Sequence, residues 1–582
     1  MTSISRFVPI LAQIQEYDRV KLSRDLVAAL VVTIMLIPQS LAYAMLAGLP
    51  PEVGLHASIL PLLAYAIFGS CRTLAVGPVA IASLMTASAL AQVTKQGIVG
   101  YLEGAMLLAL LSGGFLLLLG TLRLGFLSHF LSHSVVAGFI TASGLLIALS
   151  QLKHILGVSA EGHNFVEVAY SIAQNIGNYN PFTLALGLIS LVFLFWARRG
   201  AVGLLTKTGV KHELATTLSK VAPAAGVVGT TLLVAMLSLD LEGVAIVGAI
   251  PTGIPSLSLP RVSIEAVKAL VLPAIFISII GYVESVSVGR TLSAKRQQKV
   301  DGNQELIGLG ASNLAAGISG GFPVTGGFAR SVINFDAGAE TQFAGIFTAI
   351  GITFATLFLT PLLHYLPVAM LAATIIVAVL SLVNFSIFKE AWTFSKSDFA
   401  AVLITVVLTL VVGVEIGVAS GITSSILLHL CKTSKPHIAE IGLLPNTQHF
   451  RNVEHFEVQT SPFIVSLRID ESLMFSNVGY LEDYLDTLLI DRPQINDIIL
   501  HCGAINTIDL SALEMLEKLN KRLRVEFKRL HLSQLKGPVK ARLDKVGFIE
   551  HLSGSLYLSQ FDAYTDVVSK ITEANIELRN SS

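Results

Sequence analysis

The stretch from residue 37 to residue 85 is almost wholly apolar, yet proline and glycine interrupt it repeatedly, for example at Pro38, Pro50, Gly77 and Pro78. Non-helical backbone at membrane depth is tolerated only where the freed N–H and C=O groups face protein or a water-filled cavity. A helix that faces lipid therefore does not account for so many interruptions. The stretch predicts a polar site inside a membrane protein, an arrangement typical of transporters.

The composition of the whole chain agrees with a membrane location. The 582 residues are 53% apolar and only 13% charged, whereas soluble globular proteins carry about 25% charged residues. The three cysteines lie far apart, which favours neither a disulfide framework nor a metal cluster. The net charge is zero, so nothing indicates nucleic-acid binding. The nucleotide-binding motif G-x-x-x-x-G-K-[ST] is absent, and we expect neither enzymatic activity nor a cofactor.

Charged residues are sparse up to residue 430 and frequent after it, which divides the chain into parts. We expect a cytosolic N-terminal segment at 1–24, a transmembrane domain at 25–432, a linker at 433–455 and a soluble domain at 456–582. The N-terminus lacks the cleavage site of a secretory signal. Basic residues precede the first apolar segment, which favours a cytosolic N-terminus.

Fourteen apolar segments of the first part could cross the membrane, since a spanning helix needs about 20 residues, although three of them are short or broken. They lie near 25–47, 52–69, 77–92, 100–120, 127–150, 181–198, 218–238, 265–289, 304–318, 324–337, 343–361, 367–384, 397–413 and 415–431. With the N-terminus inside, the gaps on the cytosolic side hold most of the basic residues, which supports this count. We therefore expect a multi-pass protein of the cell inner (plasma) membrane, with both termini in the cytosol.

Fourteen segments can form two sets of seven, and because seven is odd the second set runs inverted through the membrane. We place these inverted repeats at about 25–215 and 216–432. A short segment interrupted by proline and glycine stands third in each set, after Gly77-Pro78 in the first and after residues 322–327 in the second. Paired short segments of this kind indicate a transport site between the repeats.

The soluble tail alternates between strand and helix patterns. Residues 463–469 and 497–502 predict strands, residues 478–489 and 510–524 predict helices, and residues 555–559 predict a last strand. This pattern indicates a small α/β domain of about 120 residues.

These features together resemble the sulfate permease (SulP) family, also called solute carrier family 26. Residues 38–80 and 321–331 resemble its two signature regions, and the tail resembles a STAS domain at 469–477 and 507–513. The resemblance covers nearly the whole chain. It implies a polytopic α-helical anion transporter with fourteen helices in inverted repeats, in which a core domain carries the anion and moves like an elevator against a gate domain. It also implies a homodimer with a cytosolic STAS domain.

The starts of the two short segments are the expected anion site. A helix N-terminus presents unpaired N–H groups and about half a positive charge, so two that face each other favour an anion. Gly326 and Gly327 would let a ligand approach the backbone closely, and Phe328 and Ala329 follow in the same signature. The alternative is that these glycines only permit tight packing of crossing helices.

Arg330 lies one turn into the second short segment, where its guanidinium could bind an oxyanion through two nitrogens. An arginine within a membrane segment is costly and is normally functional. The alternatives are that Arg330 reaches the membrane boundary or pairs with Asp336 or Glu284.

Gln39 and Tyr43 lie four residues apart, and therefore on one face of the first helix. They resemble family positions that line the anion cavity, as do Val79 and Ala80 in the third segment. The alternative for Tyr43 is ordinary apolar packing with a satisfied hydroxyl group.

Glu284 lies deep inside an apolar helix, where an isolated carboxylate is strongly disfavoured and tends to stay protonated. This position predicts a proton carrier. The resemblance links a carboxylate here to cation coupling, with a hydroxyl residue one turn later in sodium-coupled relatives. This chain has Val288 at that place, and because hard cations need several oxygen ligands, we favour protons over sodium. The alternative is a structural pair with Arg330.

The expected function is secondary active transport of a small anion, coupled to protons as symport. Sulfate is the leading substrate on grounds of resemblance, and bicarbonate and C4-dicarboxylates also suit such a site. The alternatives are an uncoupled anion exchanger or channel, and a membrane sensor that signals through its STAS domain. In that domain Leu510 replaces the serine that regulatory STAS proteins phosphorylate, which leaves Ser511 as a weak regulatory candidate. A cytosolic partner would suit a scaffold role of the tail.

Overall fold

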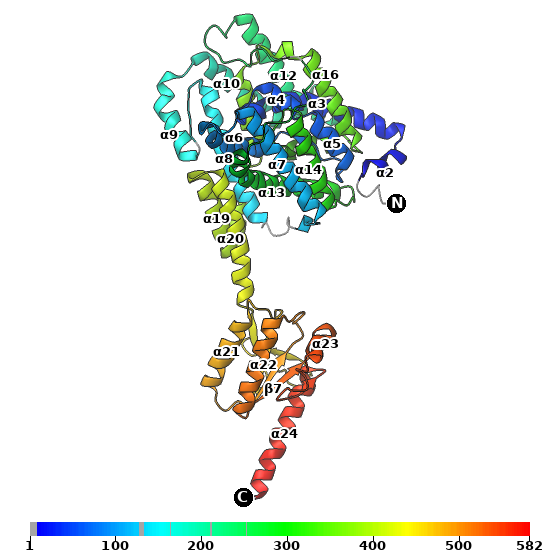
Figure 1. Cartoon of the computed structure of the whole chain (residues 1–582), viewed down its shortest axis with the longest axis vertical. Helices are drawn as coiled ribbons and strands as arrows, with labels where there is room; N and C mark the ends of the chain where they lie inside the picture. The colour runs from blue at the N-terminus through cyan, green and yellow to red at the C-terminus, as the bar shows by residue number, and fades with distance from the viewer. Residues whose placement is uncertain (1–7, 127–132, 163, 210–211, 252, 582) are drawn as a thin grey trace. The chain divides into compact units, whose positions relative to one another are not determined.

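The structure is a computed structural model (Figure 1), and it describes residues 8–126, 133–162, 164–209, 212–251 and 253–581. The chain separates into two compact units, of which the first is helical and the second is built around a β-sheet. They comprise Met1–Ser425 and Ile426–Ser582.

The first unit consists of helices with two short strands, β1 (Val76–Gly77) and β2 (Thr325–Gly326) (Figure 1). Its α-helices are α2 (Ile10–Gln15), α3 (Arg19–Leu46), α4 (Pro51–His56), α5 (Leu60–Phe68), α6 (Ala80–Lys95), α7 (Tyr101–Thr121), α8 (His133–Leu156), α9 (Phe165–Asn175), α10 (Pro181–Arg199), α11 (Ala201–Lys207), α12 (His212–Leu237), α13 (Ile264–Ala294), α14 (Gly302–Ile318), α15 (Phe328–Asp336), α16 (Phe343–Phe358), α17 (Val368–Leu380), α18 (Ser386–Phe394), α19 (Lys396–Val411) and α20 (Val414–Ser434), and the last of these continues into the second unit. Two 3₁₀ turns are η2 (Ile176–Asn178) and η3 (Thr360–Leu363).

Apart from residues 127–132, which lie outside the described residues, every one of the fourteen predicted segments coincides with one of these helices or with two in succession. Within the described residues, seven helices are long and apolar enough to cross a membrane, and three further apolar helices are shorter. The protein is therefore a helical, multi-pass membrane fold, while the count of fourteen spans stays a prediction. The predicted boundary between the repeats, at residues 215 and 216, is wrong in detail because α12 runs through it without a break.

The prolines of the opening stretch have different effects. Pro38 does not interrupt α3, which continues through it for 28 residues. Pro50 and Pro51 form the N-cap and first residue of α4. The first residues of a helix do not use their N–H groups in hydrogen bonds within the helix, so proline is tolerated there. Gly77-Pro78 is a true interruption, because it separates β1 from α6.

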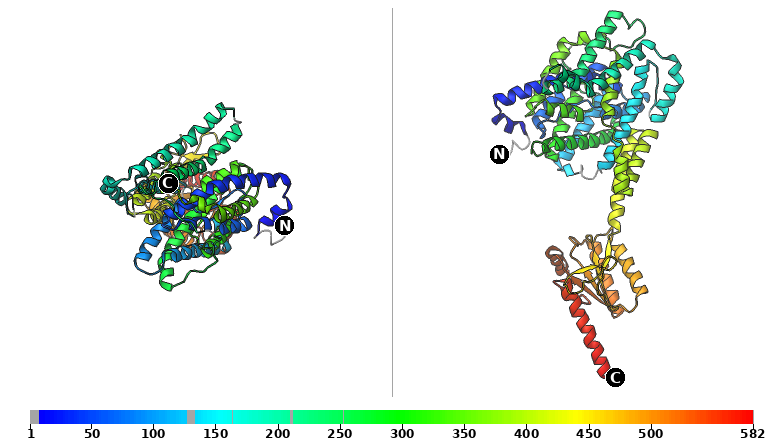
Figure 2. Two further views of the ribbon diagram at one scale, coloured as in Figure 1. Left: turned by 90° about the horizontal axis from the view of Figure 1, so that it is seen from above. Right: turned by 180° about the vertical axis from the view of Figure 1, so that it is seen from behind.

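Helices from distant parts of the chain pack side by side in the first unit. Helix α14 packs against α5 and α7, α13 packs against α7, and α17 packs against α8 and α10. Helix α16 runs alongside α3, which is visible in the views of Figure 2. The two halves of the first unit therefore form one body rather than two.

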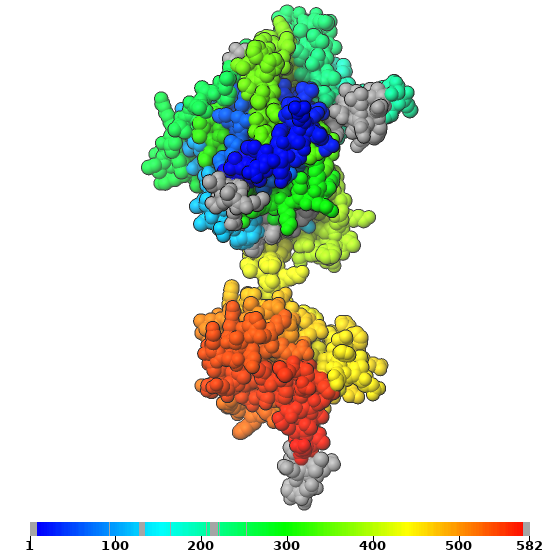
Figure 3. Space-filling model, turned by 90° about the vertical axis from the view of Figure 1, so that its right-hand side faces the viewer, coloured from blue at the N-terminus to red at the C-terminus, as the bar shows by residue number. Residues whose placement is uncertain are grey.

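Helix α2 and the first turns of α3 lie on the surface of this body, where blue atoms are seen in Figure 3, and polar contacts hold them there. The Asp25 carboxylate accepts hydrogen bonds from the backbone N–H of Glu340 at 2.7 Å and of Thr341 at 3.1 Å. The Gln13 amide donates to Gln342 at 2.9 Å. These bonds hold the segment that directly follows α15.

The second unit has a six-stranded sheet in the order β4-β3-β5-β6-β7-β8. The strands are β3 (Ile438–Leu443), β4 (Phe450–Asn452), β5 (Ile464–Ile469), β6 (Asp497–His501), β7 (Arg529–Ser533) and β8 (Leu556–Tyr557). The last four strands are parallel, and β3 is antiparallel to both of its neighbours.

Helices cover both faces of this sheet. Helices α21 (Val478–Asp491), α22 (Leu510–Val525) and α23 (Gly537–Lys545) pack on one face and bury its leucines and isoleucines. Helix α24 (Gln560–Ser581) packs on the other face through Ala563 and Val567. The predicted strands and helices of the tail occur as β5, α21, β6, α22 and β8.

The expected linker at 433–455 is wrong for most of its length. Residues 438–443 and 450–452 are strands β3 and β4, which extend the sheet beyond β5. Their backbone N–H and C=O groups pair with neighbouring strands rather than with water. The α/β domain therefore begins near residue 438, about 18 residues earlier than predicted from composition.

Candidate functional site

The two interrupted segments meet inside the helical unit. Strands β1 and β2 pair antiparallel, with Val76 opposite Gly326 and Gly77 opposite Thr325. Helix α6 begins shortly after β1 and helix α15 directly after β2, and neither helix has a side-chain N-cap. Two uncapped helix N-termini therefore lie beside one short strand pair, which favours negative charge near them.

Hydroxyl groups from α13 hold the backbone of β2 in place. The Ser285 hydroxyl accepts a hydrogen bond from the Gly326 N–H at 2.8 Å and lies 2.7 Å from the hydroxyl of Thr325. It also donates to the carbonyl of Gly281 at 2.6 Å. Residue Ser285 therefore connects the helix of Glu284 to the strand that precedes Arg330.

Two more polar side chains fix the loops around the strand pair. The Asn313 amide on α14 donates to the Val324 carbonyl at 2.9 Å and accepts from the Val324 N–H at 3.0 Å. The Ser331 hydroxyl accepts from the Ala75 N–H at 3.0 Å. The sequence reasoning missed Ser285, Asn313 and Ser331, although single polar residues in apolar helices could have indicated them.

A small cavity lies between the two helix N-termini, and it brings together almost all the predicted site residues. Helix α3 contributes two of them, and the starts of α6 and α15 contribute most of the others. The lining comprises Gln39, Tyr43, Val79, Ala80, Ile81, Glu284, Gly327, Phe328, Ala329, Arg330, Ala378, Val379 and Leu382. Gly326 does not line it, because this residue pairs with Val76 in the strand behind.

Arg330 is the only cation in this lining. Its side chain is 3% exposed, and within the described part of the chain neither Nη1 nor Nη2 has a hydrogen-bond partner. A Cβ atom built on Gly77 would lie 2.5 Å from Nη1, and one built on Gly327 would lie 3.1 Å from Nη2. These two glycines therefore make room for the guanidinium group as well as for a ligand.

Glu284 lines the same cavity from α13. Its side chain is half-buried, yet its Oε2 atom is enclosed and has no hydrogen-bond partner among the described residues. The Oε1 atom of Gln39 is also enclosed and has no hydrogen-bond partner among the described residues. The pairing of Arg330 with Glu284 or Asp336, considered above as an alternative, is not formed through the Nη atoms.

Four buried polar atoms without partners thus surround one cavity: two donors on Arg330 and one acceptor each on Gln39 and Glu284. A buried polar atom without a partner is destabilising by about 1–3 kcal/mol, and more when it is charged. Such a set is expected where a polar ligand completes the hydrogen bonds. The donors suit an oxyanion, and the enclosed carboxylate oxygen suits a proton.

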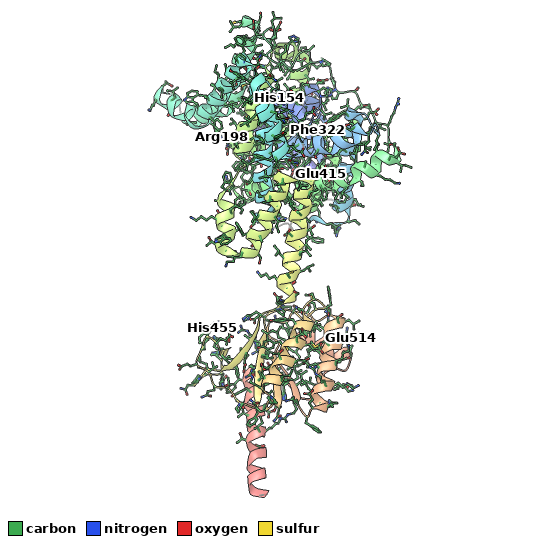
Figure 4. All side chains as sticks on the ribbon, turned by 90° about the vertical axis from the view of Figure 1, so that its left-hand side faces the viewer. His154, Arg198, Phe322, Glu415, His455 and Glu514 are labelled. Carbon is green, nitrogen blue, oxygen red and sulfur yellow. The ribbon has the colours of Figure 1, made fainter. Side chains whose placement is uncertain are left out.

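A wider cavity, here called the vestibule, adjoins the first and shares Gln39, Phe328, Ala329 and Ala378 with it. Helices α3, α10, α11, α12, α15 and α17 surround it. Arg198, which is labelled in Figure 4, lines this vestibule and donates a hydrogen bond to the Val377 carbonyl at 3.1 Å. The vestibule therefore lies next to the cavity that contains Arg330.

The second unit places Ser511 on the surface at the start of α22. The preceding Asp509 caps this helix by accepting from the Ala512 N–H at 2.9 Å, and it also accepts from the Phe475 N–H at 2.7 Å.

Across the described residues, no group of three histidine, cysteine or acidic side chains could hold a metal ion.

Comparisons with known proteins agree with this arrangement. The model of the sulfate permease family matches residues 22–405, and that of the STAS domain matches residues 455–563. Sulfate transporter 4.1, chloroplastic, of Arabidopsis thaliana is 35% identical over 96% of this chain and 82% of its own length. A probable sulfate transporter of Mycobacterium tuberculosis is 34% identical over 90% of this chain and 91% of its own length.

Solved structures share the fold. The murine solute carrier 26 family member A9 anion transporter in its inward-facing state has a TM-score of 0.87 at 24% identity, covering 97% of this chain and 94% of that chain. The transmembrane domain of the cyanobacterial bicarbonate transporter BicA has a TM-score of 0.60 at 21% identity, covering 69% of this chain and 98% of that chain. On the extent of the sequence matches, the chain belongs to the sulfate permease family of membrane transporters and carries a STAS domain.

Proposed function

We propose that the protein is a secondary active transporter of a small anion, with sulfate as the leading substrate and protons as the coupling ion. One observation supports this most: the unpartnered guanidinium of Arg330 lies in a cavity between two uncapped helix N-termini. An oxyanion there would accept hydrogen bonds from both Nη atoms and gain from both helix dipoles. The relatives named as sulfate transporters support sulfate over other oxyanions.

Glu284 supplies the proposed coupling to protons. Its enclosed Oε2 atom lines the cavity that also contains Arg330. An ionised carboxylate would repel the anion, whereas a protonated carboxyl group would not. Anion and proton would therefore bind together and cross together, which defines symport.

The proposed architecture has fourteen spans in two inverted repeats of seven. Helix α12 belongs to the first repeat as a whole, so the boundary lies between residues 237 and 264 rather than at 215 and 216. A core domain that carries the strand pair would move like an elevator against a gate domain, with the vestibule as the cytosolic entrance. We also propose a homodimer in the inner (plasma) membrane, with both termini and the STAS domain in the cytosol.

The test is uptake of radiolabelled sulfate into proteoliposomes, with and without an inward proton gradient, for the wild type and for Glu284→Gln and Arg330→Ala. We expect the gradient to stimulate uptake by the wild type, the stimulation to vanish in Glu284→Gln, and uptake to vanish in Arg330→Ala. Gradient-stimulated uptake that survives in Glu284→Gln would falsify the coupling assignment. Uptake that ignores pH and needs an anion inside the vesicle would identify an exchanger instead.

A further inference from the structure

Glu284 lines a second cavity, which lies between α6, α8, α13, α19 and α20. The two cavities share only Glu284 and Ile81. The second cavity is apolar except for two side chains, Glu284 and Thr405. Its other lining residues are Ile81, Val135, Val136, Phe139, Ile140, Ile280, Val283, Val418 and Ile422. The carboxyl group of Glu284 thus lies between a cavity with an arginine and a cavity without any charged partner.

The hydroxyl group of Thr405 determines which form of Glu284 the apolar cavity can hold. Thr405 donates its hydrogen to the Ala401 carbonyl at 2.7 Å, so its oxygen remains only as an acceptor. An ionised carboxylate is also only an acceptor, whereas a protonated carboxyl group is a donor. The apolar cavity therefore suits the protonated form and excludes the ionised form, whose charge would have no partner there.

Gly421 on α20 lies close to the Thr405 hydroxyl group, which is itself buried. A Cβ atom built on Gly421 would lie 2.9 Å from its Oγ1 atom. Any larger residue at position 421 would therefore press against this oxygen.

We propose that Thr405 is a positioning residue for the proton carrier: the protonated carboxyl group of Glu284 turns into the apolar cavity and donates a hydrogen bond to Thr405 Oγ1, and the ionised carboxylate turns back toward Arg330. This proposal rests on the proton coupling proposed above. The turn would free the anion cavity of negative charge when a proton is bound. It would also explain why Glu284 and Arg330, though they line one cavity, are not paired through the Nη atoms.

The other groups that could titrate near Glu284 are few. Tyr43 from α3 and Arg330 from α15 line the anion cavity with it. Among the described residues, α6, α8, α19 and α20 contribute no titratable side chain to either cavity, and neither do α7 and α14, which also pack against α13. A change in pH dependence caused by a substitution at Thr405 would therefore report on Glu284.

The test compares the pH profile of sulfate uptake in full-length protein for Thr405→Val, which removes the acceptor and keeps the shape, and Thr405→Ser, which keeps the acceptor. Thr409→Val is the matched control, because Thr409 lies one turn later, bonds only to the Thr405 carbonyl, and lines neither cavity. Loss of the acceptor destabilises the protonated form of Glu284 by the free energy of one hydrogen bond. We therefore expect Thr405→Val to move the midpoint of the profile toward acid by about 0.4–1 pH unit. Thr405→Ser and Thr409→Val should keep the wild-type midpoint.

A second variant covers the case in which Thr405→Val does not fold. Val136→Phe fills the apolar cavity without touching the anion cavity, and it should also move the midpoint toward acid. A wild-type midpoint in Thr405→Val, or in Val136→Phe where Thr405→Val does not fold, overturns the proposal. If Glu284→Gln still responds to pH, the proton coupling itself fails; if Glu284→Gln is flat while the midpoint of the tested variant matches the wild type, only the role of Thr405 fails.

Discussion

Replacement of Gly77 by alanine tests whether the position of Arg330 determines anion binding. The new Cβ atom would lie 2.5 Å from Nη1 of Arg330, about 1 Å closer than carbon and nitrogen atoms approach without strain. The guanidinium group must therefore move away from β1 by a comparable distance. Inserting a methyl group into a packed site is destabilising by about 1–3 kcal/mol. If the bound state carries this strain, affinity for sulfate falls between about 5-fold and 150-fold.

The assay is equilibrium binding of labelled sulfate to purified protein, with uptake into proteoliposomes as a second readout. Gly253→Ala is the control, because its φ of +157° matches the +158° of Gly77 and a Cβ atom there meets nothing within 4 Å, so it adds the same backbone strain without the clash. The double variant Gly77→Ala, Arg330→Lys should bind no worse than Arg330→Lys alone, since lysine lacks the Nη atom that clashes. Wild-type affinity in Gly77→Ala would refute the assignment of Arg330 to the anion.

Two further predictions concern groups that support the folded state. Asn313→Leu leaves both backbone groups of Val324 unpaired, and should lower the free energy of unfolding of the purified protein by roughly 2–4 kcal/mol. Thermal melting measures this change. The control is Thr353→Val, because the hydroxyl group of Thr353 bonds within its own helix. In the STAS domain, burial raises the pKa of Asp497, but hydrogen bonds from His531 and Arg529 outweigh it and lower the pKa below its ordinary value. The stability that Asp497 provides is present above the ordinary carboxyl pKa of about 3.9 and is lost as the pH falls through the lowered value. The protection factors of the β6 and β7 amides, which compare the exchange rate with the intrinsic rate at the same pH, should therefore fall in acid in the wild type and depend less on pH in Asp497→Asn.

The sequence predicts the meeting of the two interrupted segments because a short segment that opens with proline and glycine stands third in each set of seven. Gly77-Pro78 and the residues before Phe328 each end a strand and precede a helix, as expected for paired half-helices. Gln39 and Tyr43 share a cavity because four residues make about one helical turn. These features are local, and local features are readable without a structure.

The contacts that hold the site together are not local, and for that reason the sequence does not reveal them. Ser285 bonds to a backbone group 41 residues away, and Asn313 bonds to Val324, which lies in the loop between α14 and β2. Both side chains also bond within their own helices, Ser285 to the Gly281 carbonyl and Asn313 to the Leu309 carbonyl, as serine and asparagine side chains commonly do. Only the packing of α13 and α14 around β2 brings the second, distant partner within reach.

The missed strands of the STAS domain have a similar cause. Strand β7 has the sequence RLHLS, in which charged and polar residues alternate with leucine, and such a pattern predicts an exposed face. In the folded domain His531 is 3% exposed, because it bonds to the buried Asp497 on β6 at 2.9 Å. The partner lies 34 residues earlier in the chain, so the burial of β7 depends on a pairing that its own sequence does not show.

The charges around the cavity make a last prediction about substrates. Arg330 and two helix N-termini of about half a charge each supply about two positive charges when Glu284 is protonated, which balances a divalent anion. When Glu284 is ionised, its negative charge cancels one of these positive charges. The remaining positive charge, about one, balances a monovalent anion. Net charge buried at membrane depth is strongly unfavourable. Acid should therefore stimulate the transport of sulfate. The transport of nitrate, whose charge does not change with pH, should stay unchanged or fall in acid. Glu284→Gln, always neutral, should retain sulfate binding at every pH and bind nitrate less well than the wild type does in alkali. Equal stimulation of both anions by acid would mean that the proton drives movement of the carrier rather than balancing the charge of the substrate.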